Sequence, residues 1–152
     1  MESPLIDQLK FEEGFRVSVY LCSRGVRTIG YGHSLEARPW FKGAEIPSTI
    51  TRETAEELLE SDVIKTRRDL VRAWPQITLL SPARIDACVN MAFQLGVEGL
   101  MQFKKMRYEL ISGHWKNAQK EALNSDWAKQ TPNRAKRVAG QLLSGEYYEI
   151  PH

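Results

Sequence analysis

Three side chains that can take part in catalysis lie close together near the start of the chain. Glu13 is followed after eight residues by Cys22, and Cys22 is followed after five residues by Thr28. A carboxyl group can donate a proton, a thiol can ionise, and a hydroxyl can donate and accept hydrogen bonds. If the chain folds back beside Glu13, the three groups converge on one spot, which is the geometry that a hydrolytic site requires.

Two elements must position these groups. The apolar residues after Ser3 and Pro4 have helical spacing, so we expect a first helix that ends near Gly14. Between residues 17 and 35, β-forming residues flank a turn at residues 23–25 (Ser-Arg-Gly), which predicts a hairpin. Glu13 then lies at the end of a helix, and Cys22 and Thr28 lie on the hairpin.

The rest of the chain is expected to be helical. A loop over residues 39–51 leads to a long helix that Thr51 can cap and Pro75 ends. Further helices are expected in four segments, over residues 81–96, 103–113, 115–123 and 131–145. The fold class is therefore α+β and mainly α. We expect one domain over residues 1–152, with a mixed lobe at 1–50, a connecting helix at 51–75 and a helical lobe at 76–152.

Composition excludes several classes of protein. The 152 residues carry 21 Lys and Arg against 19 Asp and Glu, a net charge of +2, and 42% are hydrophobic, which excludes disorder. No apolar stretch is long enough to span a membrane, and the N-terminus has no signal-peptide pattern, so we expect synthesis in the cytoplasm. Two cysteines are too few for a zinc module or a disulfide scaffold.

Charge is distributed unevenly along the chain. Residues 1–60 have a net charge of −3, and residues 61–152 have a net charge of +5. A basic second half beside an acidic first half indicates an anionic polymer as partner. Nucleic acid is one such polymer, and bacterial cell wall is another.

The segment from Glu13 to His33 resembles the active-site segment of the phage-type lysozymes, which are endolysins related to T-even bacteriophage lysozyme. Their pattern is Glu, eight residues, Asp or Cys, five residues and Thr, followed by Ile-Gly-x-Gly-His. Residues 90–96 (Asn-Met-Ala-Phe-Gln-Leu-Gly) and 130–138 (Gln-Thr-Pro-Asn-Arg-Ala-Lys-Arg-Val) are similar to that family's cleft-lining and C-terminal helix motifs. The three motifs occur in the family's order and cover most of the chain.

The resemblance implies a lysozyme-like two-lobed fold and a muramidase activity. Its substrate would be the β-1,4 bond between N-acetylmuramic acid and N-acetylglucosamine in peptidoglycan. Glu13 would be the general acid, which must keep its proton near neutral pH. Cys22 takes the place of the family's more usual Asp on the opposite face of the sugar. Thr28 would hold the attacking water, which fits an inverting reaction.

The same resemblance implies substrate-binding roles in the helical lobe for Phe93, Gln94, Thr131 and Arg134. Arg134 aligns with the arginine that faces the catalytic glutamate in the family. A cation there would orient Glu13 but would also favour its ionised form. Three sugar-contacting positions of the family's best-studied member depart from its residues, and they are Ser34, Met106 and Glu121.

Several of these residues have a simpler structural explanation. Glu13 could be a solvated residue at a helix end, Cys22 a half-buried strand residue and Thr28 merely a β-former. Thr131 could be a helix N-cap, and Phe93 could be a core residue.

The remaining histidine and cysteine are expected to be structural. His33 has no partner set for a metal, so we expect a hydrogen-bonding role that links the hairpin to the connecting helix. Cys88 lies on an apolar stripe and is expected in the core.

The sequence as a whole predicts a monomeric phage endolysin that lyses the host cell. Its partner would be the glycan strands of peptidoglycan, with no cofactor, no metal, no nucleic acid and no membrane insertion. It would stay in the host cytoplasm until a holin-type release admits it to the periplasmic wall. The first alternative is a non-catalytic peptidoglycan-binding or tail-associated domain. The second is a nucleic-acid-binding module, which the basic run at residues 129–137 would favour, although such a run is more often a solvated face.

Overall fold

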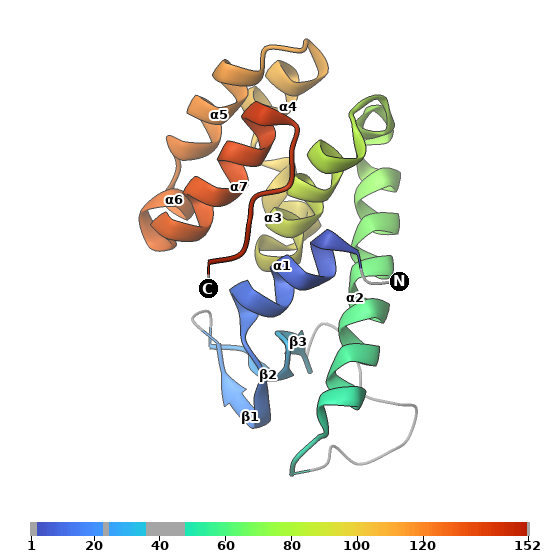
Figure 1. Ribbon diagram of the computed structural model, residues 1–152. Coiled ribbons are helices and arrows are strands. Elements are labelled where there is room, and N and C mark those ends of the chain that lie inside the picture. Colours follow the sequence, from blue (N-terminus) through green and yellow to red (C-terminus); the bar gives the residue numbers. More distant parts are fainter. Residues whose placement is uncertain (1–2, 23–24, 36–47, 152) are drawn as a thin grey trace. The chain divides into compact units, whose positions relative to one another are not determined.

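The structure is a computed structural model that describes residues 3–22, 25–35 and 48–151 (Figure 1). The chain divides into two compact units, Met1–Ile64 and Lys65–His152. Their boundary lies within the long helix α2 (Arg52–Ala73). Most of the loop expected at 39–51 lies outside the described residues.

The first unit begins with helix α1 (Pro4–Glu13). The Ser3 hydroxyl oxygen accepts a hydrogen bond of 3.2 Å from the Ile6 N–H and so caps the first turn. The helix ends where Gly14 adopts a φ of 69°, a conformation that favours glycine. The predicted first helix and its end are confirmed.

A three-stranded antiparallel sheet follows, in the order β1 (Arg16–Leu21), β2 (Arg27–Gly30), β3 (His33–Ser34). The predicted hairpin is β1 and β2, which are paired at Tyr20 with Thr28 and at Leu21 with Arg27. The pairing is irregular between Arg16 and Tyr20. Strand β3 was not predicted, because two residues are too short to produce a hydrophobic alternation.

Helix α2 confirms the predicted long helix. Its 22 residues are roughly 33 Å long at 1.5 Å per residue. The Thr51 hydroxyl caps it by accepting a hydrogen bond of 3.1 Å from the Thr54 N–H. Near the middle of α2, Asp62 bonds His33 of β3, with 2.7 Å between Oδ2 and Nδ1. This bond confirms that His33 links the hairpin region to the long helix.

The second unit is helical throughout its described elements. A 3₁₀-helix η1 (Pro75–Leu79) is followed by five α-helices, which are α3 (Pro82–Met101), α4 (Lys104–Ile111), α5 (Trp115–Leu123), α6 (Asp126–Gln130) and α7 (Pro132–Ser144). Gly96 has a φ of 78° and interrupts α3 at the point where the sequence predicted a helix end. Neither η1 nor the short α6 was predicted.

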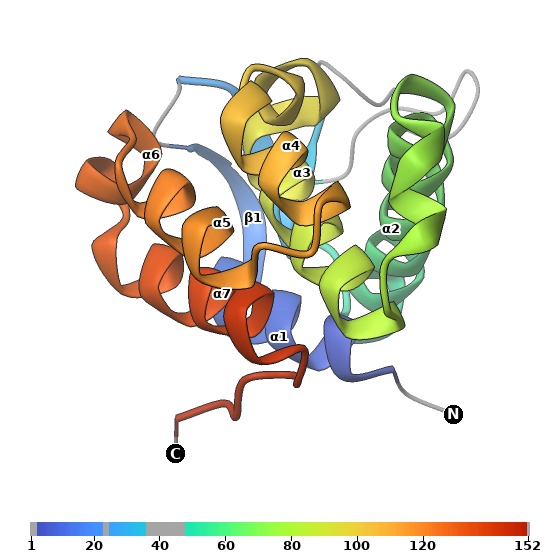
Figure 2. The same cartoon turned by 90° about the horizontal axis from the view of Figure 1, so that it is seen from above.

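Helices α5 and α7 lie side by side in both ribbon views, and α7 also packs against α3 and α6 (Figures 1 and 2). Their facing residues are apolar and fully buried, including Ala118, Ala122, Ala135, Val138 and Leu142. Small alanines on both helices allow the two backbones to approach closely. Cys88 on α3 is also fully buried, as predicted for a core residue.

The architecture confirms the predicted fold class, since a small antiparallel sheet is joined to a largely helical remainder. Within the described residues, no helix combines the length and the apolar character that crossing a membrane requires.

The pair between His33 and Asp62 leads to a stability prediction. Both side chains are only 5% exposed, whereas Lys65 and Asp69 on the same helix form a pair with side chains 49% and 32% exposed. We expect Asp62→Asn to lower the free energy of unfolding by about 3 kcal/mol, because it leaves a buried partner poorly compensated. Asp69→Asn should lower it by only about 0.5 kcal/mol. Urea unfolding measures both values, and equal losses would contradict the prediction.

Candidate active site

Glu13 is the last residue of α1, where the helix must stop. The Gly14 N–H closes the final turn by donating to the Lys10 carbonyl oxygen at 3.0 Å. Two residues later the chain enters β1. The carboxyl group of Glu13 therefore lies where the helix meets the sheet, as the sequence predicted.

Cys22 lies directly after β1, in the turn that joins β1 to β2. Its N–H donates to the Val26 carbonyl oxygen at 3.0 Å, and its own carbonyl oxygen accepts from the Gly25 N–H at 2.8 Å. Gly25 has a φ of 75°, which favours glycine at this position of the turn. These bonds fix the backbone of Cys22, and its side chain is half-buried.

Thr28 lies on β2 opposite Tyr20 of β1, and Tyr20 is two residues before Cys22 in the sequence. The Thr28 side chain is buried, and its hydroxyl donates to the Val26 carbonyl oxygen at 2.8 Å. Because the hydroxyl hydrogen already takes part in the bond to Val26, the Thr28 oxygen can act only as an acceptor toward another group.

The Tyr20 phenol connects Glu13 and Cys22 electrostatically. Burial raises the pKa of Tyr20 above its usual value, the negative charges of Glu13 and Cys22 raise it further, and Arg16 opposes them. The Arg16 guanidinium also lies 4.5 Å from the centre of the Tyr20 ring. Tyr20 lies two residues before Cys22 in the sequence, and Glu13 and Arg16 are the charged groups with the largest effects on its phenol.

The glycine before β3 provides space for the acid. A Cβ atom added to Gly32 would lie 2.5 Å from Oε1 of Glu13 and 2.9 Å from its Cδ. Gly32 also has a φ of 72°. The Glu13 carboxyl thus packs directly over the Gly32 backbone, and no other residue type leaves that space open.

Two of the predicted substrate-binding residues in the helical unit form one hydrogen-bonded group. Gln94 on α3 donates to the Thr131 hydroxyl at 3.4 Å, and its carbonyl oxygen accepts from the Trp127 indole N–H at 2.8 Å. The Thr131 hydroxyl in turn donates to the Trp127 carbonyl oxygen at 3.1 Å. Thr131 occupies the N-cap position of α7, as its structural alternative predicted, but its hydroxyl makes no capping bond to that helix.

Arg134 and Phe93 are both 7% exposed. The Nε of Arg134 donates to the side-chain oxygen of Asn90 at 3.1 Å, and its Nη2 donates to the same oxygen at 3.0 Å. Phe93 packs as a core residue of α3, which agrees with its structural alternative.

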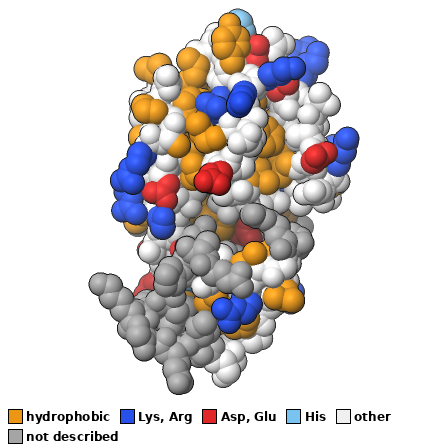
Figure 3. Space-filling model, turned by 180° about the vertical axis from the view of Figure 1, so that it is seen from behind, with side chains coloured by type: hydrophobic (Ala, Val, Ile, Leu, Met, Phe, Trp, Pro, Cys, Tyr) orange, Lys and Arg blue, Asp and Glu red, His pale blue; other side chains and the backbone are white. Residues whose placement is uncertain are grey.

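The helical unit contains a cavity of about 540 Å³. Phe103 and Trp127 line it and meet edge to face, with 6.1 Å between ring centres. Met106 and Glu121, two of the positions that depart from the family pattern, also line it. The cavity wall includes two lysines and two carboxylates, namely Lys104, Lys105, Glu121 and Asp126. Such mixing is also visible in Figure 3, where basic and acidic side chains are interspersed with apolar ones.

Sequence reasoning missed four residues that shape these groups, namely Tyr20, Gly32, Asn90 and Trp127. Trp127 precedes Thr131 by four residues, a helical spacing that could have shown their contact. Gly32 belonged to the recognised motif, but its role depends on where α1 ends in space. Among residues 3–22, 25–35 and 48–151, no three His, Cys, Asp or Glu side chains form a group that could hold a metal ion.

Residues 10–143 match the family model described as phage lysozyme. The chain is 33% identical to the pre-baseplate central spike protein of Enterobacteria phage T4, over 93% of this chain but only 28% of that protein. It is 31% identical to probable T4-type lysozyme 1 of Dictyostelium discoideum, over 95% of this chain and 96% of that protein. It is also 34% identical to the endolysin of Salmonella phage P22, over 60% of each chain. The chain thus spans about a quarter of the spike protein and nearly all of the Dictyostelium protein.

The two cysteines should react differently in the folded protein. Burial raises the pKa of the Cys88 thiol to about 12, so this group is neither ionised nor accessible at mildly alkaline pH. Cys22 is half-buried at a turn. We expect iodoacetamide to add one group per chain in buffer and two in concentrated urea, as measured by intact mass. Cys22→Asp should take up none while folded, and labelling of that variant in buffer would contradict the assignment.

Proposed function

The chain belongs to the phage lysozyme family, and from this premise we propose that it hydrolyses peptidoglycan at the β-1,4 bond between N-acetylmuramic acid and N-acetylglucosamine. The observation that carries the proposal is the packing of the Glu13 carboxyl over the Gly32 backbone, between the strand that carries Thr28 and strand β3. It supports a site in which a carboxyl at a helix end and groups of the hairpin act on one substrate bond.

In this reaction Glu13 protonates the glycosidic oxygen as the sugar develops oxocarbenium character. Cys22, as a thiolate, takes the proton that the attacking water loses, and Thr28 positions this water on the opposite face, which gives inversion at the anomeric carbon. The bond from the Thr28 hydroxyl to the Val26 carbonyl supports this role. Since Thr28 can only accept, a water beside it donates one hydrogen to Thr28 and keeps a lone pair for attack.

The helical unit supplies the substrate-binding residues Phe93, Gln94, Thr131 and Arg134, and we assign to Arg134 the orientation of the Glu13 carboxyl. The group of Gln94, Thr131 and Trp127 supports the assignment, because side chains fixed by mutual hydrogen bonds are pre-organised for binding. This unit carries 14 Lys and Arg against 8 Asp and Glu, a net charge of +6. That excess favours approach to the anionic wall polymer.

The biological role that fits this activity is lysis of a bacterial host by a monomeric phage endolysin. The enzyme would reach the periplasmic wall from the host cytoplasm after holin-type release. Similarity to an endolysin of Salmonella phage P22 supports this role.

A second candidate is a non-catalytic wall-binding or tail-associated domain. The match to part of a phage spike protein favours it, because that relative is a structural protein by name. Such a domain would sediment with purified peptidoglycan but release no reducing ends.

Replacing the acid tests the proposal. We expect Glu13→Gln to slow the loss of turbidity of outer-membrane-permeabilised Gram-negative cells by about 10²- to 10⁴-fold, because a neutral amide cannot donate the required proton. Glu12→Gln makes the same change one residue earlier, at a half-buried position outside the assigned site, and should stay within about twofold of the wild type.

Mass analysis of the digested peptidoglycan identifies the reaction. Reducing-end muramic acid supports hydrolysis, whereas anhydro-muramic acid would mean a transglycosylase. A wild type that binds wall without cleaving it would support the second candidate, and a Glu13→Gln variant with full activity would exclude the assigned acid.

The space over Gly32 gives a further test of Glu13. Both Gly32→Ala and Gly113→Ala place a side chain at a φ near +70°, which costs about 1–2 kcal/mol of stability. Only the Gly32 variant also displaces the Glu13 carboxyl, since a Cβ at Gly113 meets nothing closer than 3.9 Å. We expect Gly32→Ala to lower kcat at least about tenfold and Gly113→Ala to leave it unchanged. Equal kcat values at similar losses of stability would show that Gly32 does not position the acid.

A further inference from the structure

The guanidinium of Arg134 is hydrogen-bonded to the buried residue Asn90. Asn90 on α3 is fully buried, and it accepts three hydrogen bonds from Arg134. Two reach its side-chain oxygen at 3.1 and 3.0 Å, and one reaches its backbone carbonyl oxygen at 3.3 Å. Because the guanidinium is planar, two bonds to one amide oxygen and a third to the backbone define its plane.

The other end of the Asn90 amide is bonded to the C-terminal tail. Its Nδ2 donates to the Tyr148 hydroxyl oxygen at 3.2 Å. An amide has an accepting end and a donating end, and the guanidinium offers only donors. Tyr148 therefore occupies the donating end of the amide, and the accepting end faces Arg134. The three residues form a chain of hydrogen bonds from the tail to Arg134, in which each bond polarises the next.

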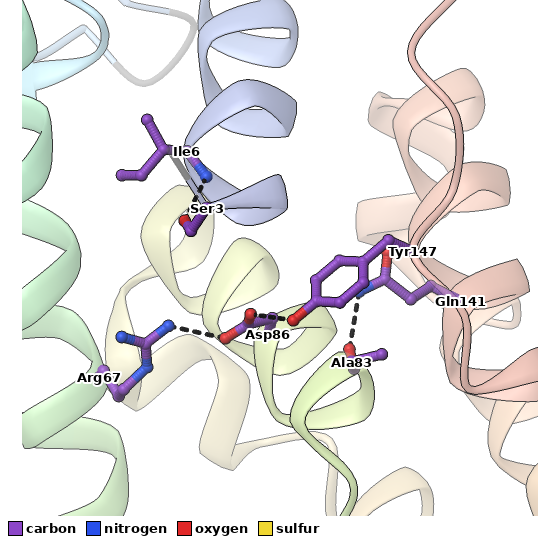
Figure 4. A network of polar contacts seen from close by, with 7 residues as sticks. All are labelled: Ser3, Ile6, Arg67, Ala83, Asp86, Gln141 and Tyr147. Carbon is purple, nitrogen blue, oxygen red and sulfur yellow. Dashed lines mark hydrogen bonds and ion pairs between the residues drawn. The ribbon is translucent and has the colours of Figure 1, made fainter. Parts of the chain in front are cut away.

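The tail is anchored independently of the Tyr148 hydroxyl. The Tyr148 backbone N–H donates to Oε1 of Gln141 at 3.2 Å. Gln141 is itself fixed, because its Nε2 donates to the Ala83 carbonyl oxygen at 2.7 Å (Figure 4). Removal of the Tyr148 hydroxyl would thus leave the backbone of Tyr148 in place.

The preceding tyrosine provides a second anchor. The Tyr147 hydroxyl donates to Oδ2 of Asp86 at 2.5 Å, and Asp86 also pairs with Arg67 through Oδ1 at 2.7 Å (Figure 4). Burial and the charge of Asp86 raise the pKa of Tyr147, so its hydroxyl keeps its proton and remains a donor. These bonds tie the tail to α3 and α2, and none of them includes Asn90 or Arg134.

We propose that Tyr148 is a positioning residue for the hydrolytic reaction, which it serves by holding the Asn90 amide against Arg134. The inference rests on the proposed function, in which Arg134 orients the catalytic carboxyl. It assigns a catalytic consequence to a tail that follows the last helix, and it separates the tasks of the two tyrosines. Tyr147 fastens the tail, and Tyr148 fixes the arginine.

The two tyrosines supply a matched pair of variants. Tyr148→Phe and Tyr147→Phe each remove one hydroxyl from the same tail and keep the ring. We expect Tyr148→Phe to lower kcat on soluble, uncrosslinked peptidoglycan strands about tenfold, because a small misplacement of an orienting group is costly for the chemical step. KM should stay within about twofold. Tyr147→Phe should lower the unfolding midpoint while leaving kcat unchanged.

A second measurement does not depend on turnover. Hydrogen exchange of the Arg134 Nε–H, followed by ¹⁵N-edited NMR and assigned with Arg134→Lys, reports how firmly Asn90 holds the guanidinium. The exchange rate should rise about tenfold or more in Tyr148→Phe and stay at the wild-type value in Tyr147→Phe.

The outcomes separate this inference from the proposed function. Equal exchange rates and equal kcat values in the two variants would overturn it, and so would a rise in KM without a fall in kcat. An inactive wild type would refute the proposed hydrolysis and with it the catalytic role of Tyr148. In that case the exchange rates would still decide whether Tyr148 positions Arg134.

Discussion

The buried bond between His33 and Asp62 is the constraint on which the first unit depends. At 2.7 Å, with both side chains nearly excluded from solvent, it ties the start of β3 to the middle of α2. Strand β3 pairs with β2 through Ile29 and His33, so the bond also fixes the strand that carries Thr28. Gly32 directly precedes His33 and supports the Glu13 carboxyl. A structural pair thus helps to fix where the acid and the hydroxyl lie.

In the helical unit, too, a buried polar side chain holds a second side chain in place, but here the buried partner is a neutral amide. Asn90 is a neutral, fully buried amide, and it satisfies donors on Arg134 while its own donor is satisfied by Tyr148. A buried charge such as that of Arg134 is tolerable only with such partners, because an uncompensated charge in the interior is strongly destabilising. The hydrogen bonds that offset the cost of burying the Arg134 charge also orient its guanidinium. Stability and positioning therefore have one origin here.

Much of the fold could be predicted from the sequence because its signals are local. The caps at Ser3 and Thr51, the interruption at Gly96 and the bond from Gly25 to Cys22 in the hairpin each depend on a few adjacent residues. The spacing of Glu13, Cys22 and Thr28 likewise indicated the candidate site, whose catalytic roles stay a prediction. The roles of Gly32, Asn90 and Tyr148 could not be predicted, because they depend on contacts between residues far apart in sequence. Thr131 lies at the predicted N-cap position, but the partner of its hydroxyl could not be predicted for the same reason, since Gln94 lies 37 residues away.

The net charge of the helical unit and the charge of its cavity have different consequences. The cavity wall pairs Lys104 and Lys105 with Glu121 and Asp126, so it has no excess of either sign. Attraction to an anionic wall must then come from the +6 of the whole unit, which acts over roughly a Debye length of about 8 Å at physiological salt. Such attraction brings the protein to the polymer without selecting a bond. Selection must come from short-range contacts, such as those that the fixed group of Gln94, Thr131 and Trp127 can offer. Salt should therefore weaken association with the wall more than it weakens cleavage of a strand already bound.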